Sequence, residues 1–150
     1  MVMKWLKDNA TVARARMAEE MTKYKNRDFM EAVIAGCAVV AAADGDISSE
    51  EKQKMLGYMQ SSDELKVFKT EDVIKSFNDI VAKFEFDAAI GQAEALKKIA
   101  KIKGKDGADR LLVRVCCAIG AADGDFDASE RAAVTRICAE LGLTASEFDL

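Results

Sequence analysis

The sequence predicts an all-α fold, organised as one compact domain of six or seven helices. The 150 residues include no proline and only nine glycines, while 50% are hydrophobic and 32% are charged. This composition is typical of a globular chain and disfavours a fold built from strands and turns. Apolar residues recur at helical spacing, and alternation with a period of two is hard to find. The length fits a single domain.

The sequence contains an internal repeat. Residues 37–51 read CAVVAAADGDISSEE and residues 116–130 read CCAIGAADGDFDASE, at a constant offset of 79 residues. Seven of the fifteen positions are identical, and most of them lie in the acidic stretch. Such a repeat usually marks a duplicated supersecondary unit. We therefore expect the two helices that carry the repeats at the centre of the fold.

The first repeat predicts a helix, an acidic turn and a second helix. Apolar residues recur at helical spacing over about 28–43, and the second half of this segment is made of small or β-branched residues, which indicates deep burial. Gly45 can form the turn that ends it. Ser48 and Glu51 form a capping box for a helix that continues to about residue 60.

The middle of the chain predicts a short turn over 61–68 and then two helices. The first of them is capped by Thr70, and the second is capped by Asp87 and continues to about residue 103, where Gly104 closes it. The apolar face expected for the first is Val73, Ile74, Phe77, Ile80, Val81 and Phe84, the clearest amphipathic pattern in the chain. The residues expected to face inward on the second are Ala89, Ala93, Leu96, Ile99 and Ala100.

The second repeat predicts the last two helices. One spans about 106–122, and Gly124 forms the turn that follows. Asp127 and Glu130 then form a capping box for a helix that Gly142 ends, before a short turn that starts at residue 144.

Charge separates a basic arm from an acidic body. Residues 1–28 have a net charge of +3, in a chain whose net charge is −4. We expect residues 1–26 to form a basic N-terminal arm or helix that can be flexible, and residues 27–150 to form the helical domain. An arm that carries Trp5 could touch an anionic membrane surface, although packing on the domain or fraying is the simpler interpretation. The acidic body disfavours nucleic-acid binding.

The absence of histidine and of long apolar segments excludes several kinds of site and location. The chain has no histidine, which excludes the common zinc sites and histidine-based catalytic triads. No segment is apolar for the ~20 residues that span a bilayer, and the N-terminus lacks the apolar core of a signal peptide. We expect a cytoplasmic protein that is monomeric alone. Its cysteines form no CxxC pair and are interpreted as buried apolar residues in a reducing compartment: Cys37, Cys116, Cys117 and Cys138.

The two acidic loops are the candidate site. Each reads D-G-x-[I/F]-x-x-x-E, which resembles the second half of an EF-hand calcium loop, but the first half is apolar in both copies. The shared carboxylates form either one composite site or two equivalent ones. A hard cation takes about six to eight oxygens, so two loops brought together could complete one site that either loop alone could not. The ligand type favours Ca²⁺, Mg²⁺ or Mn²⁺. The candidate metal ligands are Asp44, Asp46, Glu51, Asp123, Asp125 and Glu130.

Two other interpretations of these loops stay open. Glycine turns followed by capping boxes are ordinary features of a helix–turn–helix junction, and acids near a helix start are favoured by its dipole without any metal. Capping does not explain why aspartate stands on both sides of Gly45 and Gly124. The acids could also form a docking patch for another protein.

The sequence resembles the TerB family of tellurite-resistance proteins in its doubled acidic element. The element reads A-A-A-D-G-D in the first copy and A-A-D-G-D in the second, and each copy ends a helix of small residues and is followed by glutamate. The resemblance extends over about residues 27–150, and MVMKWLKDNATVARARM is similar to the start of free-standing members. It implies an all-α fold with a pseudo-twofold repeat and a non-enzymatic role in resistance to tellurium oxyanions and stress. The six carboxylates above would occupy the family's acidic metal-binding positions.

The resemblance also implies partners and a place in the cell. The partners would be the membrane protein TerC and calcium-binding TerD-type proteins, which would bring this chain to the periphery of the inner membrane. The leading hypothesis is therefore a cation-binding interaction module in a membrane-associated complex. The alternative is a thiol-based protein that handles tellurite through its cysteines. A metal-dependent hydrolase is disfavoured, because no general base or nucleophile is evident.

Overall fold

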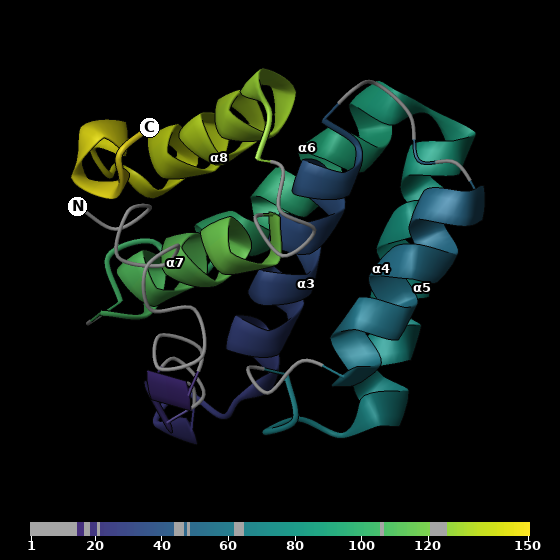
Figure 1. Cartoon of the computed structure of the whole chain (residues 1–150), viewed down its shortest axis with the longest axis horizontal. Helices are drawn as coiled ribbons and strands as arrows, with labels where there is room; N and C mark the ends of the chain where they lie inside the picture. Colours follow the sequence, from purple (N-terminus) through teal and green to yellow (C-terminus); the bar gives the residue numbers. More distant parts are fainter. Residues whose placement is uncertain are drawn as a thin grey trace.

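Helices make up the architecture of the computed structural model (Figure 1), which describes residues 15–16, 19–20, 22–43, 47, 49–61, 65–105, 107–120 and 126–150. No strand occurs in these parts of the chain, so the predicted all-α class is confirmed. None of the helices described has the length and apolar character needed to cross a membrane. The elements are α3 (Arg27–Ala41), α4 (Ser49–Ser61), α5 (Thr70–Phe86), α6 (Ala88–Ala100), α7 (Ala108–Gly120), α8 (Ala128–Leu141) and a 3-10 turn, η1 (Ala145–Phe148).

Helix α3 is the central element. Every residue from Phe29 to Val40 is buried except Glu31, and a helix that is apolar all round must have neighbours on every side. It packs against α5, α6, α7 and α8, and Figure 1 shows α4 and α5 on one side of it and α7 and α8 on the other. The side chain of Asn26 caps the helix by accepting a hydrogen bond of 2.8 Å from the backbone N–H of Phe29.

Helix α7 is buried almost as completely as α3. Between Ala108 and Gly120 only Arg110 and Arg114 reach solvent. Gly36 of α3 lies against Cys116 of α7, so close that a Cβ atom added to the glycine would stand 2.6 Å from the cysteine Sγ. The expectation that the two helices carrying the repeats lie at the centre is confirmed. The pseudo-twofold relation between them stays a prediction.

Several helix ends agree with the sequence analysis. Asp87 caps α6 by accepting hydrogen bonds from the N–H groups of Ala89 and Ile90. Gly142 ends α8 with a φ of +71°, a left-handed conformation that glycine adopts without strain. The expected cap Ser48, the turn glycines Gly45 and Gly124, and the expected ends of the α7 segment at 106 and 122 lie outside the described residues.

Two predictions about helix starts and ends were wrong. Thr70 does not cap α5: the helix begins at this residue, and Lys69 holds the cap position without a side-chain cap hydrogen bond. Helix α6 ends at Ala100, because the N–H groups of Lys101, Ile102 and Lys103 bond to the residue three positions earlier, which tightens the chain into 3-10-type turns.

The inward face predicted for α6 was also largely wrong. Ala89 and Ala93 are exposed, while Leu96 and Ala100 are half-buried. The reason is the close approach of α6 to α5, in which Gly91 lies on the backbone of Phe84 and turns the helix about its axis. The buried stripe is Gly91, Ala95 and Ile99, at intervals of four residues.

Part of the N-terminal segment packs on the domain. A guanidinium nitrogen of Arg114 in α7 lies 3.2 Å from a carboxylate oxygen of Glu20. The ring of Tyr24 lies 5.6 Å from the ring of Phe29, measured between centroids. These contacts fix the chain immediately before α3 against the core.

Candidate functional site

The structure describes only part of the predicted carboxylate site. Asp44, Asp46, Asp123 and Asp125 lie outside the described residues. Glu51 lies in the first turns of α4, but its side chain is not described. Glu130 is the one predicted ligand whose side chain is described. Whether the loops form one composite site or two equivalent sites therefore stays a prediction.

Glu130 lies in the first turn of α8 and completes the predicted capping box. Asp127 accepts a hydrogen bond of 2.8 Å from the N–H of Glu130, and Glu130 accepts one of 3.3 Å from the N–H of Asp127 through its Oε1 atom. The box is confirmed.

The start of α8 folds back onto the end of α7. A Cβ atom added to Gly120 would stand 2.5 Å from a ring carbon of Phe126 and 3.4 Å from Oε2 of Glu130. Only glycine leaves room for both side chains against the last turn of α7. Gly120 thus brings the Glu130 carboxylate next to the helix end from which the second acidic loop starts, a role the sequence analysis missed.

The apolar residue that follows each acidic triplet anchors its loop to the core. Ile47 is buried in the first copy, and the equivalent Phe126 is packed against the core in the second. Burial of such side chains contributes about 1.5–3 kcal/mol each, relative to leaving them exposed. The chain is therefore fixed on both sides of each loop, by a buried helix before it and by a buried apolar residue after it.

The electrostatics of the two helix ends favour a cation. The C-terminal end of a helix carries a partial negative charge, which lysine or arginine often balances. Neither α3 nor α7 has a basic residue in its last turn. In both copies of the repeat the sequence instead has aspartates three and five residues after that end.

The basic residues near the starts of α4 and α8 are held by other groups. Lys52 lies 3.6 Å from a carboxylate oxygen of Glu85 in α5. Arg131 donates a hydrogen bond of 3.0 Å to the carbonyl oxygen of Asp149, and its guanidinium carbon lies 5.6 Å from the centroid of the Phe126 ring. These contacts attach α4 to α5 and α8 to the C-terminus.

The four cysteines are buried and free, as the sequence analysis expected. Desolvation by burial raises the pKa of the Cys116 thiol well above its ordinary value, and the neighbouring thiol of Cys37 adds to the effect. Burial likewise raises the pKa of Cys117 to about 12 and that of Cys138 to about 11. The thiolate is the reactive and metal-binding form, so raised pKa values make these groups inert.

This burial predicts slow alkylation of the folded protein. We expect iodoacetamide at pH 8 to leave all four cysteines unmodified over a period in which the chain unfolded in guanidinium takes up four adducts, measured by mass spectrometry. The reason is that reagent access and thiolate formation both require opening of the core. If one cysteine reacts in the folded protein as fast as in the unfolded chain, the prediction is contradicted and the hypothesis of thiol-based tellurite handling gains support.

Within the described parts of the chain, no cluster of three or more Asp, Glu, Cys or His side chains is arranged to hold a metal ion. The described cysteines therefore do not form such a centre. The cation hypothesis depends on the aspartates of the two loops.

Comparison with known proteins places the chain in a family. The profile described as "Tellurite resistance protein TerB" matches residues 30–150. A protein of Alcaligenes sp. described as "Tellurium resistance protein TerB" is 44% identical over 110 residues, which cover 73% of this chain and 90% of the relative. No solved structure matches the chain. The matched region runs from the first turn of α3 to the end of η1 and includes both acidic loops, and the chain belongs to the TerB tellurite resistance family.

Proposed function

We propose that this tellurite resistance protein is a non-enzymatic interaction module whose acidic loops bind a divalent cation. The observation that carries the proposal is the setting of the two loops. Each follows the unneutralised negative end of a buried central helix, and an apolar residue that packs on the core follows it. Carboxylate and carbonyl oxygens in this setting suit Ca²⁺, Mg²⁺ or Mn²⁺.

The cation would organise a surface for partner proteins. Carboxylates close together repel each other, and a bound cation relieves that repulsion and orders the loops. The partners we propose from the family are the membrane protein TerC and TerD-type proteins. The basic arm of residues 1–26 would help to hold the protein at the inner face of the membrane, where anionic lipids attract basic segments.

The alternative function, handling of tellurite by thiols, has less support. It requires exposed cysteines whose pKa is lowered, and the pKa values of Cys116, Cys117 and Cys138 are raised by burial. All four cysteines are buried apolar residues of α3, α7 and α8.

Replacement of Glu130 by glutamine separates the cation hypothesis from simple capping. Glutamine at the third helical position keeps the capping box but removes the charge. We expect Glu130→Gln to leave the free energy of unfolding nearly unchanged in EDTA and to weaken Ca²⁺ or Mn²⁺ binding by at least about tenfold, the lower limit seen for disturbed metal sites. Isothermal titration calorimetry at low salt measures the affinity, and urea unfolding measures the stability.

Glu140→Gln provides a matched control. This residue lies on the same helix, one residue before its end, and makes the same change in net charge. We expect its cation affinity to equal that of the unmodified protein. Equal weakening by both substitutions would show a nonspecific charge effect, and no saturable heat with Ca²⁺, Mg²⁺ or Mn²⁺ in the unmodified protein would overturn the proposal.

A further inference from the structure

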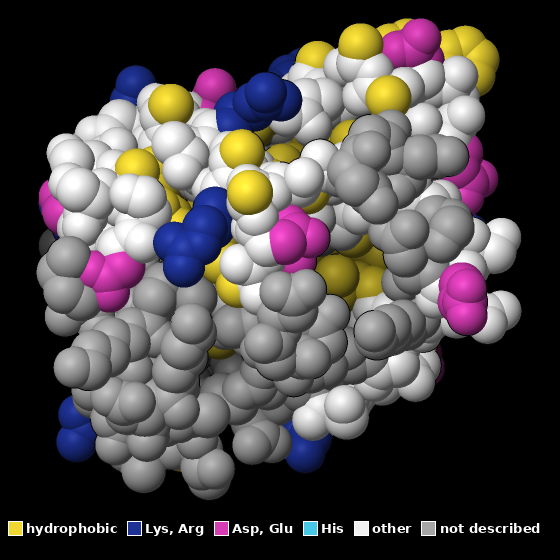
Figure 2. All heavy atoms as spheres, turned by 45° about the horizontal axis from the view of Figure 1, so that its top comes forward, with side chains coloured by type: hydrophobic (Ala, Val, Ile, Leu, Met, Phe, Trp, Pro, Cys, Tyr) yellow, Lys and Arg dark blue, Asp and Glu magenta, His cyan; other side chains and the backbone are white. Residues whose placement is uncertain are grey.

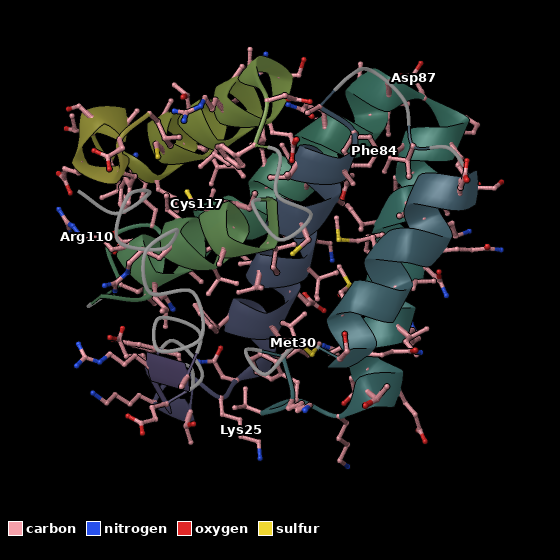
Figure 3. All side chains as sticks on the ribbon, viewed as in Figure 1. Lys25, Met30, Phe84, Asp87, Arg110 and Cys117 are labelled. Atoms are coloured by element: carbon pink, nitrogen blue, oxygen red, sulfur yellow. The ribbon has the colours of Figure 1, made fainter. Side chains whose placement is uncertain are left out.

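A second candidate site lies at the opposite end of α3 from the first acidic loop. A pocket of about 430 Å³ opens between the start of α3, the first half of α5 and the end of α6. Figure 3 places Lys25 and Met30, which line it, at one end of the molecule, and Phe84 and Asp87 at the other. None of the candidate carboxylates is among the described residues that line this pocket, and neither the family nor the proposed function assigns a role to it.

The lining of the pocket carries a positive charge although the domain is acidic. Five basic and three acidic side chains line it, which gives a net charge of +2. The basic residues come from three different parts of the chain, so the excess is a property of the fold and not of one basic stretch. They are Lys25, Arg27, Lys69, Lys75 and Lys98.

Three of the five basic side chains form ion pairs within the described part of the protein, and two do not. Glu31 binds two of the cations, with 3.1 Å between its carboxylate and Nε of Arg27 and 3.6 Å to Nζ of Lys98. Lys75 pairs with Asp79 at 2.9 Å. Within the described part of the chain, neither Lys25 nor Lys69 has an ion-pair partner. Asp72 offsets one of the charges of Lys25 and Lys69 in the pocket lining, and the group of Arg27, Lys98 and Glu31 carries the second net positive charge.

The start of α5 adds to the positive potential. Lys69 occupies the cap position, and its side chain makes no cap hydrogen bond to the N–H groups of the first turn. Those groups and the helix dipole favour an anion at this end. Glu31 also lines the pocket: burial raises its pKa, but the hydrogen bond from Arg27 and the charge of Lys98 outweigh burial and lower it.

The size and floor of the pocket indicate more than an inorganic ion. A volume of about 430 Å³ lies in the range of roughly 300–1,000 Å³ found for small-molecule sites. The floor includes the apolar side chains of Met30 and Phe68, which pack on the core. A ligand that fills the space would place an acidic group beside the lysines and an organic body over this floor.

We propose that this pocket binds a phosphate monoester of a small organic molecule. A phosphate monoester is a dianion near neutral pH and matches the net charge of +2 of the pocket lining, and lysine ammonium groups with helix N–H donors are common partners of phosphate. Asp72 lines the same pocket and can accept a hydrogen bond from a hydroxyl or amino group of the organic part.

Three probes test this in the full chain, with EDTA present so that the acidic loops hold no cation: adenosine 5′-monophosphate, adenosine and inorganic phosphate. We expect saturable amide shifts at Lys69, Ser76 and Lys98 with the monophosphate, weaker binding of inorganic phosphate and no saturable binding of adenosine. Binding should weaken as salt is raised from 0.05 M to 0.3 M, because the contacts are exposed charges.

Two lysine variants on α5 make the test specific. Lys69→Gln should lower the affinity for the monophosphate by about tenfold, the order expected for loss of a charge-assisted hydrogen bond. Lys83→Gln, near the other end of the helix, should have no effect. Equal binding of adenosine and its monophosphate, equal effects of the two variants, or shifts confined to other surfaces would overturn the proposal. Glu130→Gln should bind the monophosphate normally, so failure of this proposal and failure of the cation proposal are distinguishable.

Discussion

Gly91→Ala is expected to lower the free energy of unfolding by about 1–3 kcal/mol, the usual cost of overpacking a close contact. The added Cβ atom would stand 2.6 Å from Cα and 2.7 Å from the backbone nitrogen of Phe84. A side chain can rotate away from a clash, but this neighbour is the backbone of α5. The two helices would have to separate along the contact that positions the α5–α6 pair against α3.

A second glycine in a helix provides the control for this prediction. A Cβ atom added to Gly57 of α4 would meet nothing within 4 Å. Alanine is the better helix former, so Gly57→Ala should stabilise the protein by up to about 1 kcal/mol. Urea unfolding followed by circular dichroism measures both variants. A stabilising effect of Gly91→Ala similar to that of Gly57→Ala would show that α5 and α6 are not in this close contact.

Gly36→Ala is the second substitution with a large expected effect, again about 1–3 kcal/mol of destabilisation. Its Cβ atom would stand 2.6 Å from Sγ of Cys116, at the contact between the two central helices α3 and α7. Both residues are completely surrounded by core side chains, so there is little space into which the thiol can move.

A double-mutant cycle tests this contact directly. Cys116→Ala removes the sulfur atom and leaves a small cavity that costs stability by itself. In combination with Gly36→Ala the new methyl group occupies space that the sulfur has left, so the double variant should be more stable than the sum of the two effects, by about 0.5–3 kcal/mol. The same cycle with Cys138→Ala serves as a control and should be close to additive. Additivity at Cys116 would contradict the close packing of α3 on α7.

Few large hydrophobic side chains are exposed on the surface of the described part of the chain. Figure 2, which turns the top of Figure 1 toward the viewer, shows hydrophobic side chains scattered among charged ones, with a group at the upper right corner, the side on which the α5–α6 turn lies in Figure 1. The large hydrophobic residues exposed among the described ones, Phe86 and Ile90, both belong to this turn. Acidic Glu85 and Asp87 stand beside them in the sequence.

Local rules were sufficient to predict most helices and several caps. The face of α5 was predicted correctly because Val73, Phe77, Ile80, Val81 and Phe84 are large and recur at helical spacing, and all five are buried. The caps at Asp87 and Asp127 depend on a side chain and an N–H group two or three residues away, so the sequence alone specifies them. The cap at Asn26 follows the same rule but was missed, because that residue was assigned to the basic arm.

Features that depend on distant parts of the chain were not predicted. The face of α6 is rich in alanine, which suits any side of a helix, so only the contact of Gly91 with Phe84 decides which side is buried. Glycine has a low helix propensity, so the sequence gives no reason for Gly36 and Gly120 to lie within helices. The structure gives the reason, because Gly36 packs closely on Cys116 and Gly120 packs closely on Phe126.

The two candidate sites also differ in whether neighbouring or distant residues form them. The carboxylate loops were found from the sequence because the repeat places aspartates on both sides of a glycine twice. The basic pocket was not found, because its lining comes from three helices and each part contains only one or two of the basic residues. Whether the loops meet depends on the same kind of long-range arrangement, so the sequence leaves open a shared site and two separate sites.

The measurement that tests the central claim most directly is an NMR titration of the protein with Ca²⁺ and then Mg²⁺, following the backbone amides of Gly45 and Gly124. If the two acidic loops form one cation site, both amides should shift saturably with the same apparent affinity, and Glu130→Gln should weaken the response at both. If there are two equivalent sites, the same substitution should weaken the response at Gly124 alone. No shift at either glycine would contradict cation binding, and the loops would then be helix–turn–helix junctions stabilised by their capping boxes.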